Sequence, residues 1–173
     1  MRKSTLDLRW QLRLAWLLGG QLSWAQKSND KEHAELAKAL KGVKTSLEKG
    51  LAASETQGKP ISGKFEVEDG KLQLSVYTMK GDKFSEVIVD HKTGKVAKTE
   101  AITGGDDLTA AKAQSAAMAK AKLSLRAATE NAVKANKGFV AVSVTPSLKD
   151  GHPVAEVTLA KGEEFKTAAE KLD

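Results

Sequence analysis

The sequence lacks cysteine and is poor in proline and aromatic residues: its 173 residues include three Pro, three Trp, one Tyr and four Phe. Without cysteine the chain can form no disulfide, no thiolate metal site and no cysteine nucleophile. It also contains no His-Glu-x-x-His and no Gly-x-Ser-x-Gly pattern, the motifs of common zinc proteases and serine hydrolases. What is present is 40% hydrophobic and 29% charged residues, enough apolar material for an ordinary globular domain.

Residues 1–25 have the layout of a secretory signal peptide. A basic stretch precedes a short apolar run, Leu14 to Gly20, and the small residues Ser23 and Ala25 stand at positions −3 and −1 of a predicted cut before Gln26. The apolar run is shorter than the roughly 20 residues that span a bilayer. We therefore predict a periplasmic or secreted protein with no membrane span after cleavage. An amphipathic first helix of the fold and an uncleaved anchor are the alternatives.

The formal net charge of +6 suggests a nucleic-acid partner, but the leader carries half of it. Residues 1–25 contain four basic residues and one acidic residue, which leaves 24 basic against 21 acidic residues, or +3, in 26–173. All three Trp lie in the leader, and Arg126 is the only arginine that follows it. Arginine makes bidentate phosphate contacts and aromatic side chains stack on bases, so we predict no nucleic-acid partner.

The remaining sequence contains an internal repeat. The matching pairs are Ser46-Leu47 and Ser124-Leu125 at an offset of 78, then Asp69-Gly70 and Asp150-Gly151, Lys80-Gly81 and Lys161-Gly162, and Phe84 and Phe165 at an offset of 81. The change of offset predicts a three-residue insertion within 145–149. We predict a first repeat over 26–102, a linker at 103–107 and a truncated second repeat over 108–173.

Each repeat is predicted to hold two helices and a three-stranded antiparallel sheet, an α+β fold with helices on one face of the sheet. Apolar residues three or four apart over 36–51 predict helices that break at Gly42, with Thr45 and Glu48 as a capping box. Alternation with a period of two predicts strands over 61–67, 72–78, 84–90, 140–144, 154–159 and 164–169. An alanine-rich, peripheral helix is expected over 108–121.

The segment 58–96 resembles a PepSY domain, the module named after peptidase propeptides. The resemblance rests on VDHKTGKV, where Asp90, Thr93 and Gly94 match the closing pattern Val-Asp-x-x-Thr-Gly-Lys-Val. Asp90 can bond its own turn and Gly94 can take a positive φ. The second repeat resembles the module through GHPVAEVTLAKGEEFKT, but ends before such a turn. The resemblance implies an envelope module that inhibits or regulates a peptidase, with a layout similar to the beta-lactamase inhibitor protein, or a free-standing periplasmic protein of unknown role.

The candidate catalytic groups do not converge on a recognisable motif. The three histidines have no metal-ligand spacing. Glu66 and Glu68 fall on one outward strand face, and Asp106 and Asp107 fall at a helix start, where acids are favoured by the helix dipole. We therefore predict that the chain is not an enzyme and has no cofactor and no metal among its site residues.

Binding is the favoured function. The outward face of the central hairpin presents Gln73, Ser75, Tyr77 and Met79, and Tyr and Met are enriched at the centres of protein interfaces. We predict that these residues contact a protein partner, an enzyme such as a peptidase. The four residues could instead cover the sheet or pack against the other repeat. Other functions left open are a carrier of a small ligand or metal ion between the repeats, and a structural envelope protein.

Overall fold

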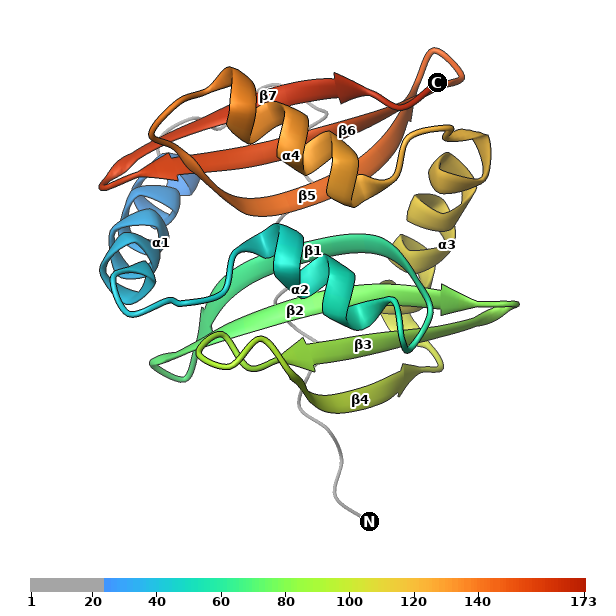
Figure 1. The fold of residues 1–173 in the computed structure, drawn as a ribbon, viewed down its shortest axis with the longest axis horizontal. Helices are drawn as coiled ribbons and strands as arrows, with labels where there is room; N and C mark the ends of the chain where they lie inside the picture. Colours follow the sequence, from blue (N-terminus) through green and yellow to red (C-terminus); the bar gives the residue numbers. More distant parts are fainter. Residues whose placement is uncertain (1–23) are drawn as a thin grey trace.

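The computed structural model describes residues 24–173, which form four helices and one seven-stranded antiparallel sheet in an α+β fold (Figure 1). The elements are α1 (Trp24–Leu40), α2 (Leu47–Ser54), β1 (Lys59–Glu68), β2 (Lys71–Lys80), β3 (Lys83–Val89), β4 (Val96–Ile102), α3 (Gly105–Lys120), α4 (Leu125–Ala135), β5 (Val140–Lys149), β6 (His152–Lys161) and β7 (Glu164–Lys171). The predicted signal peptide, 1–25, lies outside the described residues except for its last two. The predicted cut before Gln26 falls in the first turn of α1.

The sheet corrects the predicted fold, which gave each half a three-stranded sheet of its own. The strand order is β4-β3-β2-β1-β5-β6-β7, and the halves meet at the centre, where Gly63 pairs with Val144 and Lys64 with Ser143. The first half also has a fourth strand, β4, which pairs only with β3. The prediction was wrong because period-two alternation identifies strands but not their distant neighbours, and the polar centre of β4 gives a weak alternation signal.

Helices α2 and α4 lie side by side on one face of this sheet (Figure 1). Leu47 and Leu51 of α2 and Leu125 of α4 are almost completely buried there. Gly63 lets α2 approach β1 closely, because a Cβ atom at this position would lie 3.1 Å from Leu51 Cδ2. The core of the molecule is therefore formed between these two helices and the central strands.

Each of these two helices begins with a serine cap. Ser46 Oγ accepts a hydrogen bond from the Lys49 amide at 3.4 Å, and Ser124 Oγ accepts one from the Ala127 amide at 3.2 Å. The predicted capping box at Thr45 is wrong by one position. Thr45 is buried, and its amide donates to the carbonyl of another loop.

The three extra residues of the second half lengthen its helix. Helix α2 has 8 residues and α4 has 11. The strands that follow begin at positions 59 and 140, so the offset of 81 is already established before β5. The predicted insertion within 145–149 is therefore wrong: about one turn of helix is added instead.

The other face of the sheet is packed against α3. Ser62 Oγ of β1 donates to Gln114 Oε1 of α3 at 2.8 Å, and Ala117 and Met118 of that helix are buried. Helix α3 is thus less peripheral than its alanine content predicted. It begins at Gly105, so Gly105 to Asp107 of the predicted linker belong to its first turn. Helix α1 reaches the edge strand β7, where the His33 ring stacks on the Phe165 ring with centroids 4.1 Å apart.

Candidate functional site

The turn that carries the PepSY resemblance is held by its own backbone. Asp90 Oδ1 accepts hydrogen bonds from the amides of Lys92 and Thr93, both at 2.8 Å. The Thr93 and Lys92 amides hold the pKa of Asp90 below its usual value, because they stabilise the carboxylate. Gly94 has a φ of +73°, and its amide donates to the Asp90 carbonyl at 2.7 Å. All three predicted motif residues therefore act within one tight turn.

This turn fixes the loop that precedes α2. The carbonyl of His91 accepts hydrogen bonds from the amides of Lys44 at 3.1 Å and Thr45 at 3.0 Å. A Cβ atom on residue 94 would lie 3.2 Å from Thr45 Oγ1, so the turn and the loop are in close contact. The motif turn therefore holds the end of β3 against the loop that leads into α2.

The second half achieves the same connection without that turn. The carbonyl of Leu172 accepts hydrogen bonds from the amides of Lys122 at 2.6 Å and Leu123 at 3.0 Å. Leu172 is completely buried, and its own amide donates to the Pro153 carbonyl at 2.9 Å. Leu172, directly after β7, thus makes in the second half the backbone contacts that His91 makes in the first half.

The four predicted partner-contacting residues share one face of β2, the face opposite α2. Ser75 and Tyr77 are buried, with exposed fractions of 0% and 5%, and Gln73 and Met79 are half-buried. Met79 Sδ accepts a hydrogen bond from Ser115 Oγ of α3 at 2.8 Å. The structure brings the four residues onto one face as predicted, but it places Ser75 and Tyr77 beneath the surface.

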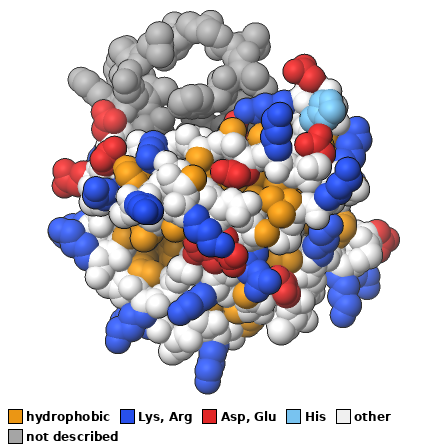
Figure 2. Space-filling view, turned by 45° about the horizontal axis from the view of Figure 1, so that its top comes forward, with side chains coloured by type: hydrophobic (Ala, Val, Ile, Leu, Met, Phe, Trp, Pro, Cys, Tyr) orange, Lys and Arg blue, Asp and Glu red, His pale blue; other side chains and the backbone are white. Residues whose placement is uncertain are grey.

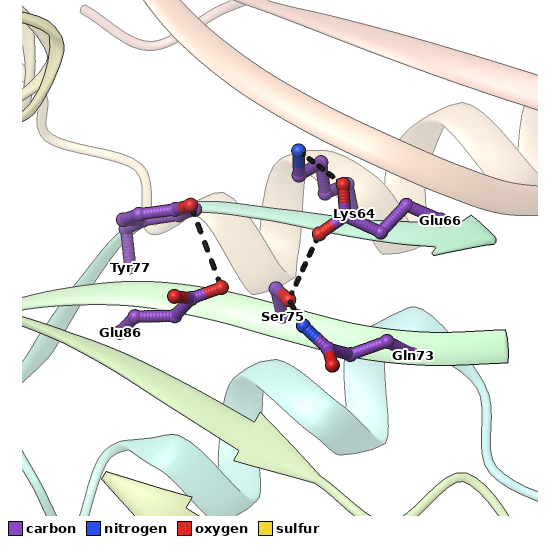
Figure 3. A network of polar contacts seen from close by, with 6 residues as sticks. All are labelled: Lys64, Glu66, Gln73, Ser75, Tyr77 and Glu86. Carbon is purple, nitrogen blue, oxygen red and sulfur yellow. Dashed lines mark hydrogen bonds and ion pairs between the residues drawn. The ribbon is translucent and has the colours of Figure 1, made fainter. Parts of the chain in front are cut away.

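Around these residues lies a polar network on β1, β2 and β3 (Figure 3). Gln73 Nε2 donates to Ser75 Oγ at 3.0 Å, and Ser75 Oγ donates to Glu66 Oε1 at 3.1 Å. Farther along β2, Tyr77 Oη donates to Glu86 Oε1 of β3 at 3.5 Å. The far-face network comprises Lys64, Glu66, Gln73, Ser75, Tyr77 and Glu86.

Glu86 is the most buried carboxylate of this network, with 7% of its surface exposed. Burial raises its pKa, the Ser75 hydroxyl acts in the opposite direction, and the nearby Glu66 carboxylate adds to the increase. Lys64 Nζ forms an ion pair with Glu66 Oε2 at 2.6 Å. Burial therefore favours the protonated form of Glu86 more than in the unfolded chain. The hydrogen bonds of the network join neighbouring strands.

A different surface, at one end of the second half, was missed by sequence reasoning. We call it the lysine-framed surface: Phe139 with Lys161 and Lys166. The ammonium groups of both lysines lie over the Phe139 ring. Val140, which follows Phe139, is 54% exposed on the opposite face of the sheet, because it pairs with Ala160 and not with the residues that share a face with the lysines. More than twenty residues separate the ring from the lysines in the chain, so only the β5–β6–β7 pairing brings them together. No local pattern of the sequence indicates this convergence, because the three side chains come from separate segments.

The two halves also enclose a shallow depression of about 180 Å³. Its lining residues are Glu55, Gly58, Lys59, Pro60, Met118, Ser124, Leu125 and Arg126. Residues 24–173 contain no group of three His, Asp or Glu side chains arranged to hold a metal ion. In the same range, no helix is both long enough and apolar enough to cross a membrane.

Comparison of this chain with protein-family models, curated proteins and solved structures finds no match. The resemblance to the PepSY domain stays a prediction that rests on the quoted residues.

Proposed function

We propose that this chain is an exported, non-enzymatic protein that binds an envelope enzyme, such as a peptidase, and regulates it. The observation that carries the proposal is the end of the second half where two lysines cover the Phe139 ring on one face of the sheet and Val140 is 54% exposed on the other. An exposed apolar side chain can enter the core of a protein interface without rearrangement. The signal-peptide layout of residues 1–25 and the VDHKTGKV turn support the export and the regulatory role.

The contact surface differs from the one that the sequence predicted. Tyr77 is 5% exposed and is hydrogen-bonded to Glu86, so a partner could reach it only after a rearrangement. Val140 is already exposed, so a partner can contact it without a rearrangement. In the view of Figure 2, lysine and arginine side chains are dispersed among hydrophobic patches and a few acids, so the charged groups are available to a partner without unfolding.

Export is tested by the mass of the protein recovered from cells. We expect the mature chain to begin at Gln26 and to contain no tryptophan, because Trp10, Trp16 and Trp24 precede the cut. A chain that retains residues 1–25 in the cytoplasm would contradict the exported role.

Regulation is tested by adding the purified mature protein to an envelope extract and measuring the peptidase activity. We expect the activity to change in a saturable way, and Val140→Asp to abolish the effect. Leu148→Asp is the matched control, because Leu148 is 41% exposed at the other end of the same strand. An extract whose activity is insensitive to the protein, or equal effects of both variants, would contradict the proposal.

A second candidate function, the binding of a small ligand or metal ion between the halves, has the depression beside Arg126 in its favour. Its volume of about 180 Å³ is below the roughly 300–1,000 Å³ of most ligand pockets. This candidate predicts a rise in melting temperature with a defined ligand, and loss of that rise in Arg126→Ala.

A further inference from the structure

The sheet ends on one side at β7, and no other strand of residues 24–173 lies beyond it (Figure 1). The Leu172 amide donates to the Pro153 carbonyl of β6 at 2.9 Å, which shows the direction of the backbone groups at the end of this ladder. Because the β6–β7 register is unbroken from Glu164 to Lys171, the even-numbered residues turn their amides toward β6. The amides and carbonyls of residues 165, 167, 169 and 171 therefore face the open edge.

The edge strand on the opposite side, β4, has two features that oppose further pairing. Its register with β3 shifts at the end of β3, and such irregularities twist an edge away from a new strand. Its Lys98 and Glu100 form an ion pair with each other at 2.7 Å. Strand β7 contains no register shift and no proline, and no ion pair of the described residues joins its Lys166 to its Glu170. Of the two edges, β7 is therefore the better suited to receive another strand.

The side chains of β7 form a pattern that matches its own reverse. Lys166 and Glu170 stand two residues to either side of Ala168 and project from the same face of the sheet, since side chains alternate along a strand. When a second β7 lies antiparallel with Ala168 opposite Ala168, each Lys166 faces Glu170 of the second copy. On the other face, each Phe165 then faces Lys171 of the second copy, which allows a cation–π contact.

Neighbouring registers pair the charges less well. Moving the centre to Thr167 places Glu164 opposite Glu170 of the second copy, and like charges directly opposite each other destabilise a strand pair. Moving it to Ala169 separates Lys166 from Glu170 and removes both ion pairs. We infer that β7 pairs with β7 of a second copy of this chain, centred on Ala168, so that the sheet continues across a symmetric dimer.

A second copy fits this edge better than a strand of another protein does. It supplies the opposite charge at both ends of the pairing, whereas another strand would need an acid and a base at the same spacing in reverse order. A two-fold axis uses each β7 once and closes the assembly, while pairing of β7 with β4 would give an open chain. Lys166 Nζ lies 3.9 Å from the Phe139 ring centroid, so pairing exchanges an exposed cation–π contact for an ion pair. The inference does not depend on the proposed function, whose contact residue Val140 lies on β5.

The charge pattern is tested by sedimentation of the mature chain at increasing concentration. We expect a monomer–dimer equilibrium whose Kd rises about tenfold in Lys166→Glu and in Glu170→Lys, because each change places like charges opposite each other twice. The combined variant Lys166→Glu/Glu170→Lys exchanges the charges and is expected to return the Kd to within about threefold of the unchanged chain. The matched control, Lys98→Glu, makes the same charge change on β4 and is expected to leave the Kd unchanged.

The backbone pairing is tested by Thr167→Pro. Residue 167 turns its amide toward the open edge, so proline removes no hydrogen bond to β6 but removes a donor to the second copy. We expect the dimer to be lost while the circular dichroism spectrum is retained. The inference is overturned if the unchanged chain stays monomeric up to millimolar concentration, if Lys166→Glu and Lys98→Glu weaken the dimer equally, or if the charge-exchanged variant fails to recover. A folded Thr167→Pro variant that still dimerises would overturn it as well.

Discussion

The two halves of the sheet are built from equivalent hairpins, but their far faces, opposite α2 and α4, differ. In the first half, Tyr77 and Glu86 are buried and hydrogen-bonded to each other. At an offset of 81 the second half has Thr158, which is half-buried, and Thr167, which is exposed. Glu156, the equivalent of Ser75, forms an ion pair with Lys149 in which both side chains are about half exposed. The same backbone framework thus supports a buried polar network on one side and a solvated strand face on the other.

A second difference lies in α2 and α4, the helices that cover the other face of the sheet. Leu51 of α2 corresponds to Thr129 of α4 at an offset of 78, and both are completely buried. The Thr129 hydroxyl donates to the Leu125 carbonyl of its own helix at 2.7 Å. The first half therefore buries a larger apolar group, while the second satisfies a polar one locally.

The largest expected effect is that of removing the Leu51 side chain. Leu51→Ala should lower the free energy of unfolding by about 2–5 kcal/mol, because it leaves a cavity between α2 and β1. Thr129→Ala should lower it by about 1 kcal/mol or less, since it removes only one hydroxyl and its local hydrogen bond. Urea titration of both variants measures the difference. Equal losses would show that the two helices contribute alike.

The next effect concerns the turn that only the first half contains. Gly94→Ala should destabilise the protein by about 1–2 kcal/mol, because alanine is strained at a φ of +73°. The matched control is Gly70→Ala, which has the same φ of +73° but no neighbouring atom within 4 Å of the added methyl. We expect Gly94→Ala to lose more stability in thermal unfolding, because its methyl also presses on Thr45. Equal losses would mean that the contact with the loop before α2 is unimportant.

The smallest effect is a pH dependence that comes from the buried network. Burial raises the pKa of Glu86 above its ordinary value of 4.5, so the folded state holds that proton more tightly than the unfolded chain does. The resulting stability is fully present below the ordinary pKa and is lost as the pH rises through the raised pKa. Glu86→Gln should remove this loss, and Glu156→Gln, on the exposed face of the second half, should not. Urea titrations from about pH 4 to about pH 8 would compare the two profiles, and identical profiles would contradict the assignment.

Much of the local structure could be predicted from the sequence, and the exceptions have physical causes. Period-two alternation located the strands around Phe65, Val76 and Val157, because one face of each is buried. It could not join β1 to β5, since that pairing links residues far apart in the chain. The motif turn at Asp90 was identified because its conformation is set by local hydrogen bonds.

The candidate surfaces were harder to predict than the elements. Alternation put Tyr77 on the correct face of β2, but whether a sheet face is buried depends on the elements packed against it. The lysines over Phe139 come from another hairpin, so neither composition nor spacing indicates them. Sequence patterns thus specified side-chain direction, whereas burial and the convergence of distant groups required the tertiary structure.

The central pairing of β1 with β5 has a consequence for the order in which the chain folds during synthesis. The ribosome releases β1 to β4 before any part of β5, so the backbone groups along β1 first form an open edge. Open edges are where nascent chains join one another and aggregate, and lysines along them oppose such joining. Lys64, which later pairs with Ser143, lies on that transient edge. Lys64 therefore places a charged side chain on the strand that stays unpaired on one side until β5 has been synthesised.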